Sequence, residues 1–523
     1  MMLSKSNPDE IQSFVSDASY LPGGFASRVI FPESAAQVAE VLASATREGT
    51  PVTVSGAGTG TVAGRVPFGG YVLATDRLNK TKNIVKDEAG GRAVVEAGVV
   101  LADFQRLLEP EALLYPPDPT ERSCFLGGNI ATNASGARTF KYGPTRNYVE
   151  RLRIALATGD LIDLRRGELR ADARGRIEIP LQSGRTIETR LPSYRMPQVR
   201  KHASGYYVMP CMDLIDLFIG SEGTLGVIVD AEVRLLPKPE GLIAGIVFFK
   251  DQYQLLAFVR ETRNLSLQNR AKQAPAGKTV ASATESHPED VWPELTHLDA
   301  RALEYFDKES LSFLRERYPL VPSSAVGAIF FEQEVSAKTE DDLLTAWYEY
   351  LQAHGAMLDE SWFATSEPDQ EKLREFRHQL PVLMNEWFAR YKKQKVSTDM
   401  AVPDDEFAGM LRLYEETLFA SELRYTIFGH IGDNHVHVNI LPRDDAEAGE
   451  AQEIYMQFVR RAVKVGGTIS AEHGIGKLKR KYLREMYTEE HLREMAALKR
   501  AFDPAGILGR GNIFSETLLS GLR

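Results

Sequence analysis

The sequence feature that most restricts the fold is a glycine-rich loop that follows directly on an apolar strand. Residues 51–55 (PVTVS) have the pattern of a strand, and residues 56–70 (GAGTGTVAGRVPFGG) come immediately after it. Glycines let backbone N–H groups approach a phosphate with no Cβ in the way, and neighbouring hydroxyl groups can donate further hydrogen bonds. The spacing fits neither a Walker loop nor a Rossmann fingerprint. The loop by itself therefore leaves two interpretations open, an ordinary turn and a phosphate-binding site.

The residues around this loop predict an α/β unit in the first part of the chain. A strand at residues 28–32 and an amphipathic helix at residues 34–49 precede the loop. Residues 115–149 carry a second glycine-rich stretch with many small, hydrogen-bonding side chains, which suits a long ligand that lies extended along the chain. Residues 213–237 close this part with a helix, a Gly–Ser–Glu–Gly turn and a buried strand.

The second half of the chain has a different character. Residues 241–263 predict a strand followed by a helix, and residues 339–356 predict a strongly amphipathic helix. Residues 265–290 are polar and small, without periodicity, so we expect an inserted loop there. Together these patterns indicate an α+β domain.

Composition excludes several classes of protein. The 523 residues are too many for one core, so two or more domains are expected. The net charge of −10 disfavours a nucleic-acid partner. The two cysteines, Cys124 and Cys211, exclude a disulfide scaffold, a cysteine-rich zinc module and an iron–sulfur cluster. There is no apolar run of the ~20 residues needed for a membrane span and no signal-peptide pattern, so a soluble cytoplasmic protein is expected, with peripheral membrane contact left open.

The densest group of chemically active side chains is the segment GHIGDNHVHVN at residues 429–439. It holds three of the ten histidines, His430, His435 and His437, within a strand–turn–strand pattern. On the returning strand His435, His437 and Asn439 share one face, while the other face is apolar. Three polar groups on one face of a strand are typical of the wall of a site.

A second short segment, AEHGIGK at residues 471–477, places Glu472 beside His473. Imidazoles with a carboxylate are ligands that a divalent metal prefers, and a further histidine can serve as a general base. The simpler interpretation is a half-exposed hairpin with a solvated polar face. The density of histidines, with Glu472 and His473 nearby in the sequence, favours a site over that interpretation.

Four motifs, taken together, resemble those of one flavoprotein group. They are PPDPT with GGNIATNASG, GSEGTLGVI, GHxGDxxxHxN and EHGIG. With them the chain resembles the FAD-dependent D-2-hydroxyacid dehydrogenases, the group of D-lactate dehydrogenase, D-2-hydroxyglutarate dehydrogenase and the glycolate-oxidase D-subunit, within the vanillyl-alcohol-oxidase/PCMH superfamily. The resemblance runs from about residue 27 to residue 515.

This resemblance implies an α+β fold with two principal domains. The first would be a PCMH-type FAD-binding domain, and the second a ferredoxin-like α+β substrate (cap) domain of the FAD-linked oxidase C-terminal type. The implied boundaries are the FAD-binding domain at 27–238, the cap domain at 239–480, which contains the inserted loop predicted at 265–290, and a tail at 481–523 that returns to the FAD domain. Before them, an N-terminal helical segment is predicted at 1–26 from the residues themselves, because Asn7-Pro8-Asp9 suits the start of a helix.

The resemblance places the FAD site in the first domain. Ser55 and Ala57 depart from the commoner family form, which often has arginine and glycine there, and because both are small we expect little consequence. The first histidine of the chain is His202, so the loop offers no histidine for a covalent link and non-covalent FAD is expected. The implied cofactor-binding residues are Ser55, Gly56, Ala57, Gly58, Thr59, Gly60, Pro117, Asp118, Gly127, Gly128, Asn129, Thr132, Asn133, Gly136, Glu222, Gly223, Gly226 and Ile228.

The resemblance also implies a metal site and a substrate site. His430, His437 and Glu472 would hold a divalent metal, Zn or Mn, and His473 would be the general base. Arg377 would bind the substrate carboxylate, because a guanidinium suits a carboxylate in bidentate geometry. The other implied substrate-binding residues are Lys395, His435 and Asn439. Two positions depart from the family pattern: His435 stands where asparagine is usual, and Asn512 stands where a lysine is frequent.

The implied reaction is the oxidation of a D-2-hydroxy acid, similar to D-lactate, to the 2-oxo acid, with hydride transfer to flavin N5. Because an NAD fingerprint is lacking, electrons would pass to a quinone, a cytochrome, an electron-transfer flavoprotein or a partner subunit. One alternative is an alkyl-glycerone-phosphate-synthase-like FAD transferase without net redox, whose relatives have His-His-Gly where this chain has Glu472-His473-Gly474. Another is an inactive flavin-binding subunit, which would have lost its metal ligands. A homodimer and contact with the inner membrane stay open.

Overall fold

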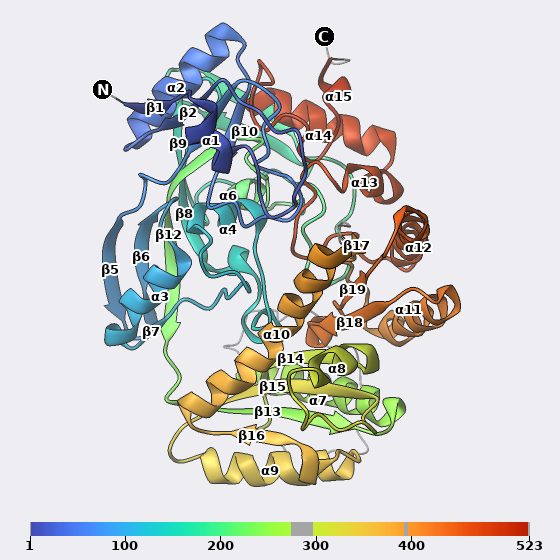
Figure 1. Ribbon diagram of the computed structural model, residues 1–523. Helices are drawn as coiled ribbons and strands as arrows, with labels where there is room; N and C mark the ends of the chain where they lie inside the picture. Colours follow the sequence, from blue (N-terminus) through green and yellow to red (C-terminus); the bar gives the residue numbers. More distant parts are fainter. Residues whose placement is uncertain (1, 274–296, 392–395, 521–523) are drawn as a thin grey trace. The chain divides into compact units, whose positions relative to one another are not determined.

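The computed structural model describes residues 2–273, 297–391 and 396–520 (Figure 1). The chain forms two compact units, and it returns to the first at Gly466, before the expected boundary at residue 481. A short excursion at Ala137–Tyr142 belongs to the second unit, because its helix packs on a strand there. The first unit consists of Met1–Gly136, Gly143–Lys238 and Gly466–Arg523, and the second of Ala137–Tyr142 and Pro239–Val465.

The first unit begins with a four-stranded sheet in the order β1–β2–β4–β3. Its strands are β1 (Leu3–Lys5), β2 (Arg28–Phe31), β3 (Val52–Ser55) and β4 (Tyr71–Ala74). The helix α2 (Ala35–Glu48) begins at the N-cap Ser34, ends at Gly49 with φ of +67°, and buries its apolar face against this sheet.

The N-terminal segment contains less helix than the sequence suggested. Leu3–Lys5 forms β1 because it pairs antiparallel with β2, and this strand was not predicted. The helical part is limited to α1 (Pro8–Ile11) and the 3-10 turn η1 (Gln12–Phe14). Asn7 caps α1 by accepting from the N–H of Asp9, and Pro8 occupies the first helical position.

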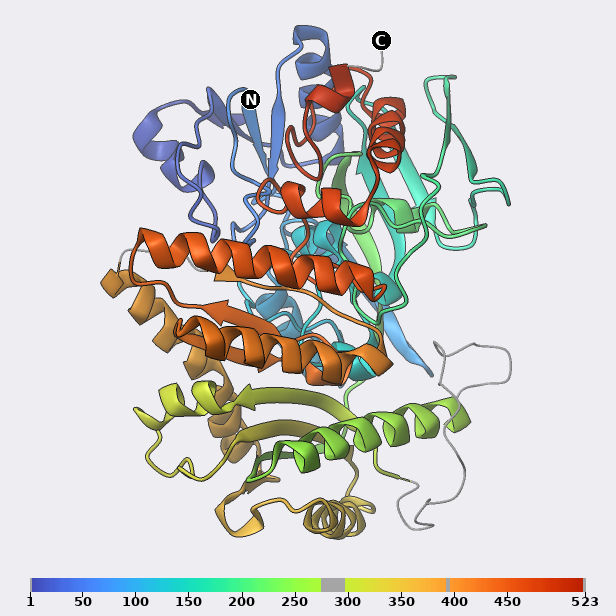
Figure 2. The same ribbon diagram turned by 90° about the vertical axis from the view of Figure 1, so that its right-hand side faces the viewer.

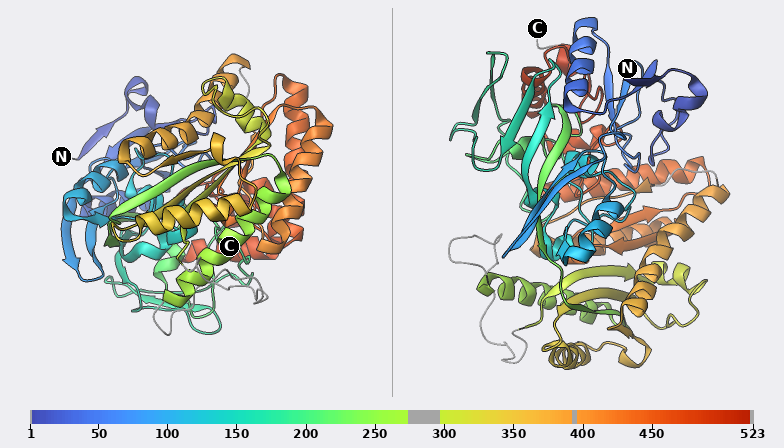
Figure 3. Two further views of the ribbon diagram at one scale, coloured as in Figure 1. Left: turned by 90° about the horizontal axis from the view of Figure 1, so that it is seen from below. Right: turned by 90° about the vertical axis from the view of Figure 1, so that its left-hand side faces the viewer.

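A second, antiparallel sheet in the first unit has the order β5–β6–β12–β8–β9. Figure 3 shows β5 and β6 beside β12 in its right-hand view. The central strand β12 is 11 residues long, and β7 pairs with its end. The strands are β5 (Thr81–Asp87), β6 (Gly90–Glu96), β7 (Leu113–Leu114), β8 (Val149–Ala155), β9 (Leu161–Arg165) and β12 (Val227–Pro237).

Short helices and one further hairpin complete the first unit. They are α3 (Leu101–Leu108), η2 (Glu109–Glu111), α4 (Leu126–Thr132), η3 (Thr145–Tyr148), the hairpin of β10 (Arg176–Pro180) and β11 (Thr186–Arg190), α6 (Ile215–Phe218), α13 (Arg480–Met486), α14 (Glu489–Phe502) and α15 (Thr517–Ser520). The last three lie in the returning C-terminal segment.

The second unit is built on a seven-stranded antiparallel sheet in the order β16–β13–β15–β14–β18–β19–β17. Its first four strands, with α7 (Gln252–Gln273) and α9 (Glu340–Ala353), have the β-α-β-β-α-β pattern of a ferredoxin-like fold. An additional helix, α8 (Lys308–Arg315), lies between β14 and β15 in the chain, and β18, β19 and β17 extend the sheet. The strands are β13 (Gly241–Phe249), β14 (Ala300–Asp307), β15 (Gly327–Val335), β16 (Trp362–Ala364), β17 (Val396–Ser397), β18 (Tyr425–Gly429) and β19 (His437–Ile440).

Helices cover this sheet and form its hydrophobic core. On one face, Phe376 and Leu380 of α10 and Leu311 of α8 pack against Phe306 and Phe330. The left view of Figure 3 shows α7 and α9 over the sheet, and Figure 2 shows α11 and α12 along its extension. The helices of this unit are α5 (Thr139–Tyr142), α7 (Gln252–Gln273), α8 (Lys308–Arg315), α9 (Glu340–Ala353), η4 (Leu358–Glu360), α10 (Glu367–Tyr391), η5 (Asp404–Glu406), α11 (Phe407–Ser421), η6 (Ile431–Asp433) and α12 (Asp445–Lys464).

The prediction of an inserted loop at 265–290 is wrong for the first part of that range. Residues up to Gln273 continue α7, and two of their polar side chains, Ser266 and Asn269, are buried. Asn269 donates to the carbonyl of Leu298 at 2.8 Å, and Arg270 pairs with Asp299 at 2.6 Å. Polar residues that lack periodicity in the sequence can therefore lie at a packed face. The rest of the predicted loop lies outside the described residues.

None of the helices that the structure describes is long and apolar enough to cross a membrane.

Candidate active site

The first unit contains a cavity with walls made largely of glycine-rich loops. The loop after β3 forms one wall, and the start of α4 forms another. An added Cβ at Gly60 or Gly128 would meet no atom within 4 Å, so the backbone there faces open space. The implied cofactor-binding residues that line the cavity are Gly56, Ala57, Gly58, Thr59, Gly60, Gly127, Gly128, Asn129, Thr132, Glu222, Gly223, Gly226 and Ile228.

Two buried polar atoms in the cavity wall have no hydrogen-bond partner among the described residues. They are Nδ2 of Asn129, which is 4% exposed, and Oδ2 of Asp17, which is 9% exposed. Burying a polar group without a partner is costly, so both atoms fit a cavity that takes a polar ligand. An amide donor, a carboxylate acceptor and exposed backbone together suit a flavin dinucleotide, and the residues present therefore fit FAD.

Some implied cofactor residues support the loops from outside the cavity. Asn133 ends α4 with φ of +50°, and its Oδ1 accepts from the N–H of Arg146 at 2.9 Å. An added Cβ at Gly136 would lie 2.1 Å from the carbonyl oxygen of Asp118, and the Asp118 carboxylate pairs with Arg122 at 3.3 Å. The implied residues that do not line the cavity are Ser55, Pro117, Asp118, Asn133 and Gly136.

Arg65 lines the cavity and was not among the implied residues. Its Nη1 donates to Oγ of Ser55 at 3.0 Å and to the carbonyl of Gly56 at 2.6 Å, and its Nε donates to the carbonyl of Ser16 at 2.9 Å. Its guanidinium therefore fastens the first residues of the loop and places a positive charge in the cavity wall. The family often has arginine at the position of Ser55, and here the guanidinium of Arg65 lies beside that serine. The serine in place of an arginine was the sequence signal that could have pointed to Arg65.

Replacing Arg65 with alanine is expected to weaken FAD binding by about tenfold to a hundredfold. The charge-assisted hydrogen bonds that are lost are each worth about 1.5–3 kcal/mol, and tenfold corresponds to about 1.4 kcal/mol. Titration of the flavin-free protein with FAD, followed by flavin fluorescence, measures the effect. The control is Arg77→Ala, because Arg77 pairs with Glu33 at the surface of the same unit. Equal FAD affinities in R65A and R77A would contradict the prediction.

The segment that carries Glu472 and His473 is held within the first unit by Glu222. Oε1 of Glu222 accepts from the N–H of Ile475 at 2.7 Å, and Oε2 accepts from the N–H of Gly476 at 2.6 Å. Burial raises the pKa of Glu222, and the two backbone donors oppose that shift. His473 lines the glycine-lined cavity. The implied general base and the implied FAD residues thus border one cavity of one unit.

The carboxylate of Glu472 is oriented by two side chains that the sequence did not indicate. Oε2 of Glu472 accepts from Oγ of Ser135 at 3.0 Å and from Nζ of Lys201 at 3.2 Å. Lys201 is 1% exposed and also donates to the carbonyl of Gly136 at 3.0 Å. Oε1 of Glu472 lies 3.8 Å from Nε2 of His473.

Asn512, where the family often has lysine, joins the C-terminal segment to the glycine-rich loop. Its Nδ2 donates to the carbonyls of Gly64 at 2.9 Å and Glu222 at 3.2 Å. Nζ of Lys477 donates to Oδ1 of Asn512 at 2.7 Å, and burial lowers the pKa of Lys477 to about 8. A half-buried lysine from another segment therefore lies against this asparagine.

In the second unit, β18 and β19 form the hairpin predicted around the histidines. Phe428 pairs with His437 across the two strands. The regular part of the returning strand starts at His437, and His435 makes only an isolated bridge, with Ala401. Gly429 has φ of +126°, and a Cβ there would lie 3.0 Å from Cδ2 of His437. Glycine at this position therefore makes room for the His437 ring.

The turn between the strands is fixed by a buried arginine of α7. Arg263, 3% exposed, donates through Nε to the carbonyl of Gly432 at 3.0 Å and through Nη2 to that of Ile431 at 2.7 Å. Asn434 ends the turn in the left-handed region with φ of +54°. The position of the histidines is thus set by contacts far apart in the sequence.

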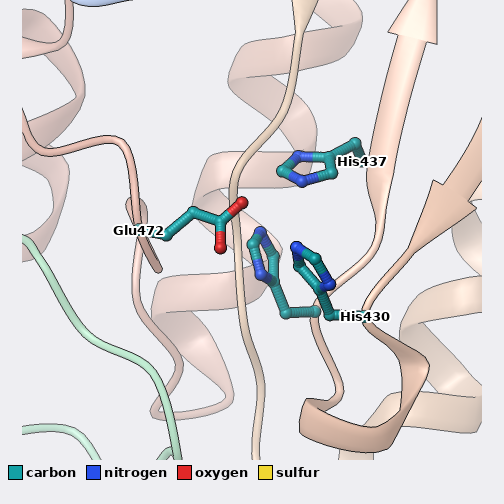
Figure 4. A group of neighbouring side chains, drawn as sticks. His430, His437 and Glu472 are labelled. Atoms are coloured by element: carbon teal, nitrogen blue, oxygen red, sulfur yellow. The ribbon is translucent and has the colours of Figure 1, made fainter. Parts of the chain in front are cut away.

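His430, His435 and His437 gather their rings at the end of this hairpin. The ring centroids are 5.3 Å apart for His430 and His435, 5.7 Å for His430 and His437, and 4.6 Å for His435 and His437. Each offers a ring nitrogen within 4.8 Å of those of the others. Figure 4 shows the neighbouring rings of His430 and His437 of the second unit, and it also labels Glu472 of the first unit.

His430 and His437 each have a partner for Nδ1, which is the arrangement typical of metal-binding histidines. The partners are Oε1 of Glu304 for His430 (2.6 Å) and the carbonyl oxygen of Thr398 for His437 (3.0 Å). Nε2 of these two rings is then the atom that would bind a divalent metal. Nε2 of His435 lies 3.0 Å from Oδ1 of Asp399, an ion-pair distance.

The implied substrate residues are placed as follows. Arg377 of α10 donates to Oε2 of Glu304, through Nε at 2.9 Å and Nη2 at 2.8 Å. Asn439 is fully buried, and its Oδ1 lacks a hydrogen-bond partner among the described residues. His435 is fully buried beside His437. Lys395 lies outside the residues that the structure describes.

Comparison with known families identifies both halves of the chain. Residues 26–165 match the family described as "FAD binding domain", and residues 291–513 match "FAD linked oxidases, C-terminal domain". Among solved structures, an alkyldihydroxyacetonephosphate synthase superposes with a TM-score of 0.63 over 97% of this chain and 82% of that chain. Its sequence identity of 15% means that this likeness shows the fold alone.

Three curated relatives match over nearly the whole chain. The D-lactate dehydrogenase of Anaerostipes hadrus is 30% identical over 92% of this chain and 88% of its own length. The glycolate oxidase subunit GlcD of Bacillus subtilis is 28% identical over 93% of this chain and 89% of its own length. The D-2-hydroxyglutarate dehydrogenase of Stutzerimonas stutzeri is 27% identical over 94% of this chain and 91% of its own length. The fold and the cavity, with these matches, define an FAD-dependent oxidoreductase. The chain belongs to the FAD-linked oxidase family that contains these three proteins.

Proposed function

We propose that this protein oxidises a D-2-hydroxy acid to the 2-oxo acid, with FAD and a divalent metal as cofactors. The observation that carries the proposal is the position of His473, an implied general base that lines the cavity fitted to FAD. The relatives named D-lactate dehydrogenase and D-2-hydroxyglutarate dehydrogenase support the class of substrate. The transferase alternative has only a likeness in fold to support it.

The FAD would be held without a covalent bond. Among the described residues that line the cavity, the one histidine is His473, which the proposal uses as a base. The backbone of the glycine-rich loop, with Arg65 and Asn129, would bind the cofactor by hydrogen bonds. When bound, FAD supplies the acceptor for a hydride.

The metal would be held by Nε2 of His430 and of His437, and the family resemblance adds Glu472 as a carboxylate ligand. Two imidazoles and one carboxylate suit Zn or Mn. When bound, the metal supplies a positive charge that lowers the pKa of a substrate hydroxyl. His435 would lie next to the metal ligands and contact the substrate. Asn439 would be a second substrate-binding residue, and its buried Oδ1 lacks a hydrogen-bond partner among the described residues.

Two side chains of this protein would have separate roles in the reaction, one in substrate binding and one in proton transfer. Arg377, whose guanidinium is held by Glu304, would bind the carboxylate of the hydroxy acid. A ring nitrogen of His473 would take the proton of the substrate hydroxyl, and FAD, when bound, would supply the acceptor for the hydride of C2. The products are the 2-oxo acid and the reduced cofactor. A quinone, a cytochrome, an electron-transfer flavoprotein or a partner subunit would reoxidise it.

The test is anaerobic mixing of the FAD-loaded protein with D-lactate, D-2-hydroxyglutarate, glycolate and the L-enantiomers of the first two. We expect one or more of the D-acids to bleach the visible absorbance of the oxidised flavin, and the L-acids to leave it unchanged. A flavin that no acid of a broad 2-hydroxy-acid panel reduces would refute the proposal.

A further inference from the structure

Glu304 of β14 joins an implied metal ligand to an implied substrate-binding residue within the second unit. Its side chain is 3% exposed. Oε1 lies 2.6 Å from Nδ1 of His430, and Oε2 accepts from Nε of Arg377 at 2.9 Å and from Nη2 at 2.8 Å. No sequence motif included Glu304, because it lies in the middle of a strand more than a hundred residues before the histidines.

We propose that Glu304 is a positioning residue that fixes the tautomer of His430, so that Nε2 of this histidine is a metal ligand, and that Arg377 fixes the orientation of the Glu304 carboxylate. The inference rests on the proposed function, because it assigns a task to two residues of that site. It extends that function by making metal binding depend on a carboxylate that is not itself a ligand.

The hydrogen-bond donors and acceptors around His430 determine which of its ring nitrogens carries the proton. A carboxylate only accepts, so Nδ1 of His430 must carry the proton in its contact with Glu304. The neutral ring then has its lone pair on Nε2, the atom that a metal needs. Arg377 only donates, and the two contacts that it makes with Glu304 both go to Oε2, while Oε1 faces Nδ1 of the histidine.

A glutamine at position 304 would reverse this pattern while keeping the shape of the side chain. Because Arg377 requires an acceptor, the amide oxygen would face the guanidinium and the amide nitrogen would face His430. The amide N–H would donate to Nδ1 of His430, which places the proton of the ring on Nε2. Metal binding would then have to break that hydrogen bond and shift the proton.

A buried glutamate on the neighbouring strand provides a matched control. Taken as whole residues, Glu332 of β15 is 3% exposed and Glu304 is 2% exposed, so both are buried. It also binds a guanidinium, because its Oε2 accepts from Nε of Arg301 at 2.8 Å. The other guanidinium groups near it are those of Arg138 at 3.7 Å and Arg374 at 3.9 Å, so Glu332→Gln disturbs a buried ion-pair network and leaves the contact of Glu304 with His430 in place.

The experiment measures Zn²⁺ affinity by competition with a chromogenic chelator on purified, FAD-loaded protein. We expect E304Q to bind Zn²⁺ about 10–100-fold more weakly than the wild type, which is the loss typical when the partner of a metal-binding histidine is removed. E332Q should keep the wild-type affinity. Zn²⁺ affinity that E304Q retains, or that E332Q loses to the same extent, would overturn the inference.

A double variant separates tautomer control from general damage to the fold. In Glu304→Gln with Arg377→Met, the amide is no longer held by the guanidinium and can turn its oxygen toward His430. The Zn²⁺ affinity should therefore recover toward the wild-type value, although two buried residues are changed. If the double variant binds Zn²⁺ as weakly as E304Q or more weakly, Arg377 does not set the orientation of the carboxylate and the inference fails.

These results are distinguishable from a failure of the proposed function. Weak Zn²⁺ binding by E304Q in a protein whose flavin no hydroxy acid reduces would support the role of Glu304 and refute the proposed reaction. Flavin reduction by a D-acid in a protein whose E304Q variant binds Zn²⁺ normally would support the reaction and refute the role of Glu304.

Discussion

Replacing His473 with glutamine is expected to slow anaerobic reduction of the flavin by a D-2-hydroxy acid by about 10²–10⁴-fold, the contribution typical of a general base. Glutamine keeps a polar side chain of similar length but cannot take up the substrate proton. The bound FAD should stay in place, because His473 is one residue in a cavity wall made largely of glycine-rich loops. Rapid mixing with saturating substrate measures the rate directly.

The matched control is His491→Gln in the same unit. His491 lies on α14 and packs against the rings of Tyr194 and Tyr487, and it does not line the cavity. H491Q should reduce its flavin at the wild-type rate. A His473→Gln variant that reduces flavin as fast as H491Q would show that the base is another group.

Replacing His437 with alanine is expected to remove the bound metal. His437 is an implied ligand, so its loss should weaken metal binding by more than the about 10–100-fold that loss of a ligand's outer partner costs. Because the FAD cavity belongs to the first unit, the FAD content should not change. Metal analysis and the flavin spectrum of the purified variant provide the two measurements, and flavin reduction should fall together with metal content.

The variant His435→Asn tests whether His435 is a metal ligand or a neighbour of the ligands that contacts the substrate. Nε2 of His435 lies 3.0 Å from Oδ1 of Asp399, and the family usually has asparagine at the position of His435. We expect H435N to keep its metal and to change only the relative rates with different hydroxy acids. Loss of metal from H435N would make His435 a third imidazole ligand and would contradict its assignment as a substrate-contacting residue.

The sequence predicted the parts of the site that lie close together along the chain. The glycine-rich loop after β3 and the stretch around Gly127–Asn129 were recognisable because close approach to a phosphate demands small residues in runs. The hairpin that carries His430 and His437 was recognisable from a turn between two alternating strands. Both signals are local, and the structure places these residues at a cavity and at a histidine cluster.

The residues that the sequence did not reveal act through contacts between distant segments. Arg65 donates to the carbonyl of Ser16, Lys201 donates to Glu472, and Glu304 contacts His430. A single arginine, lysine or glutamate has no local pattern that separates it from an ordinary surface charge. Only the pairing of strands and the packing of loops bring these groups to their partners.

One prediction about secondary structure is wrong because the sequence pattern did not indicate that polar residues of α7 are buried. Residues 265–273 read as a loop because their polar side chains have no apolar period. In the structure they continue α7, since Ser266 and Asn269 satisfy backbone groups at a buried face. A periodicity argument counts such residues as exposed, and it fails where hydrogen bonds replace apolar contact.

The central claim is that a 2-hydroxy acid reduces the flavin of this protein with the help of a bound divalent metal. The most direct measurement is anaerobic flavin reduction by a D-2-hydroxy acid before chelation, after removal of the metal, and after reloading with Zn²⁺ or Mn²⁺. The account predicts rapid bleaching, its loss by chelation although FAD stays bound, and its recovery on reloading. Equal rates of bleaching in the metal-free and the reloaded protein would contradict it.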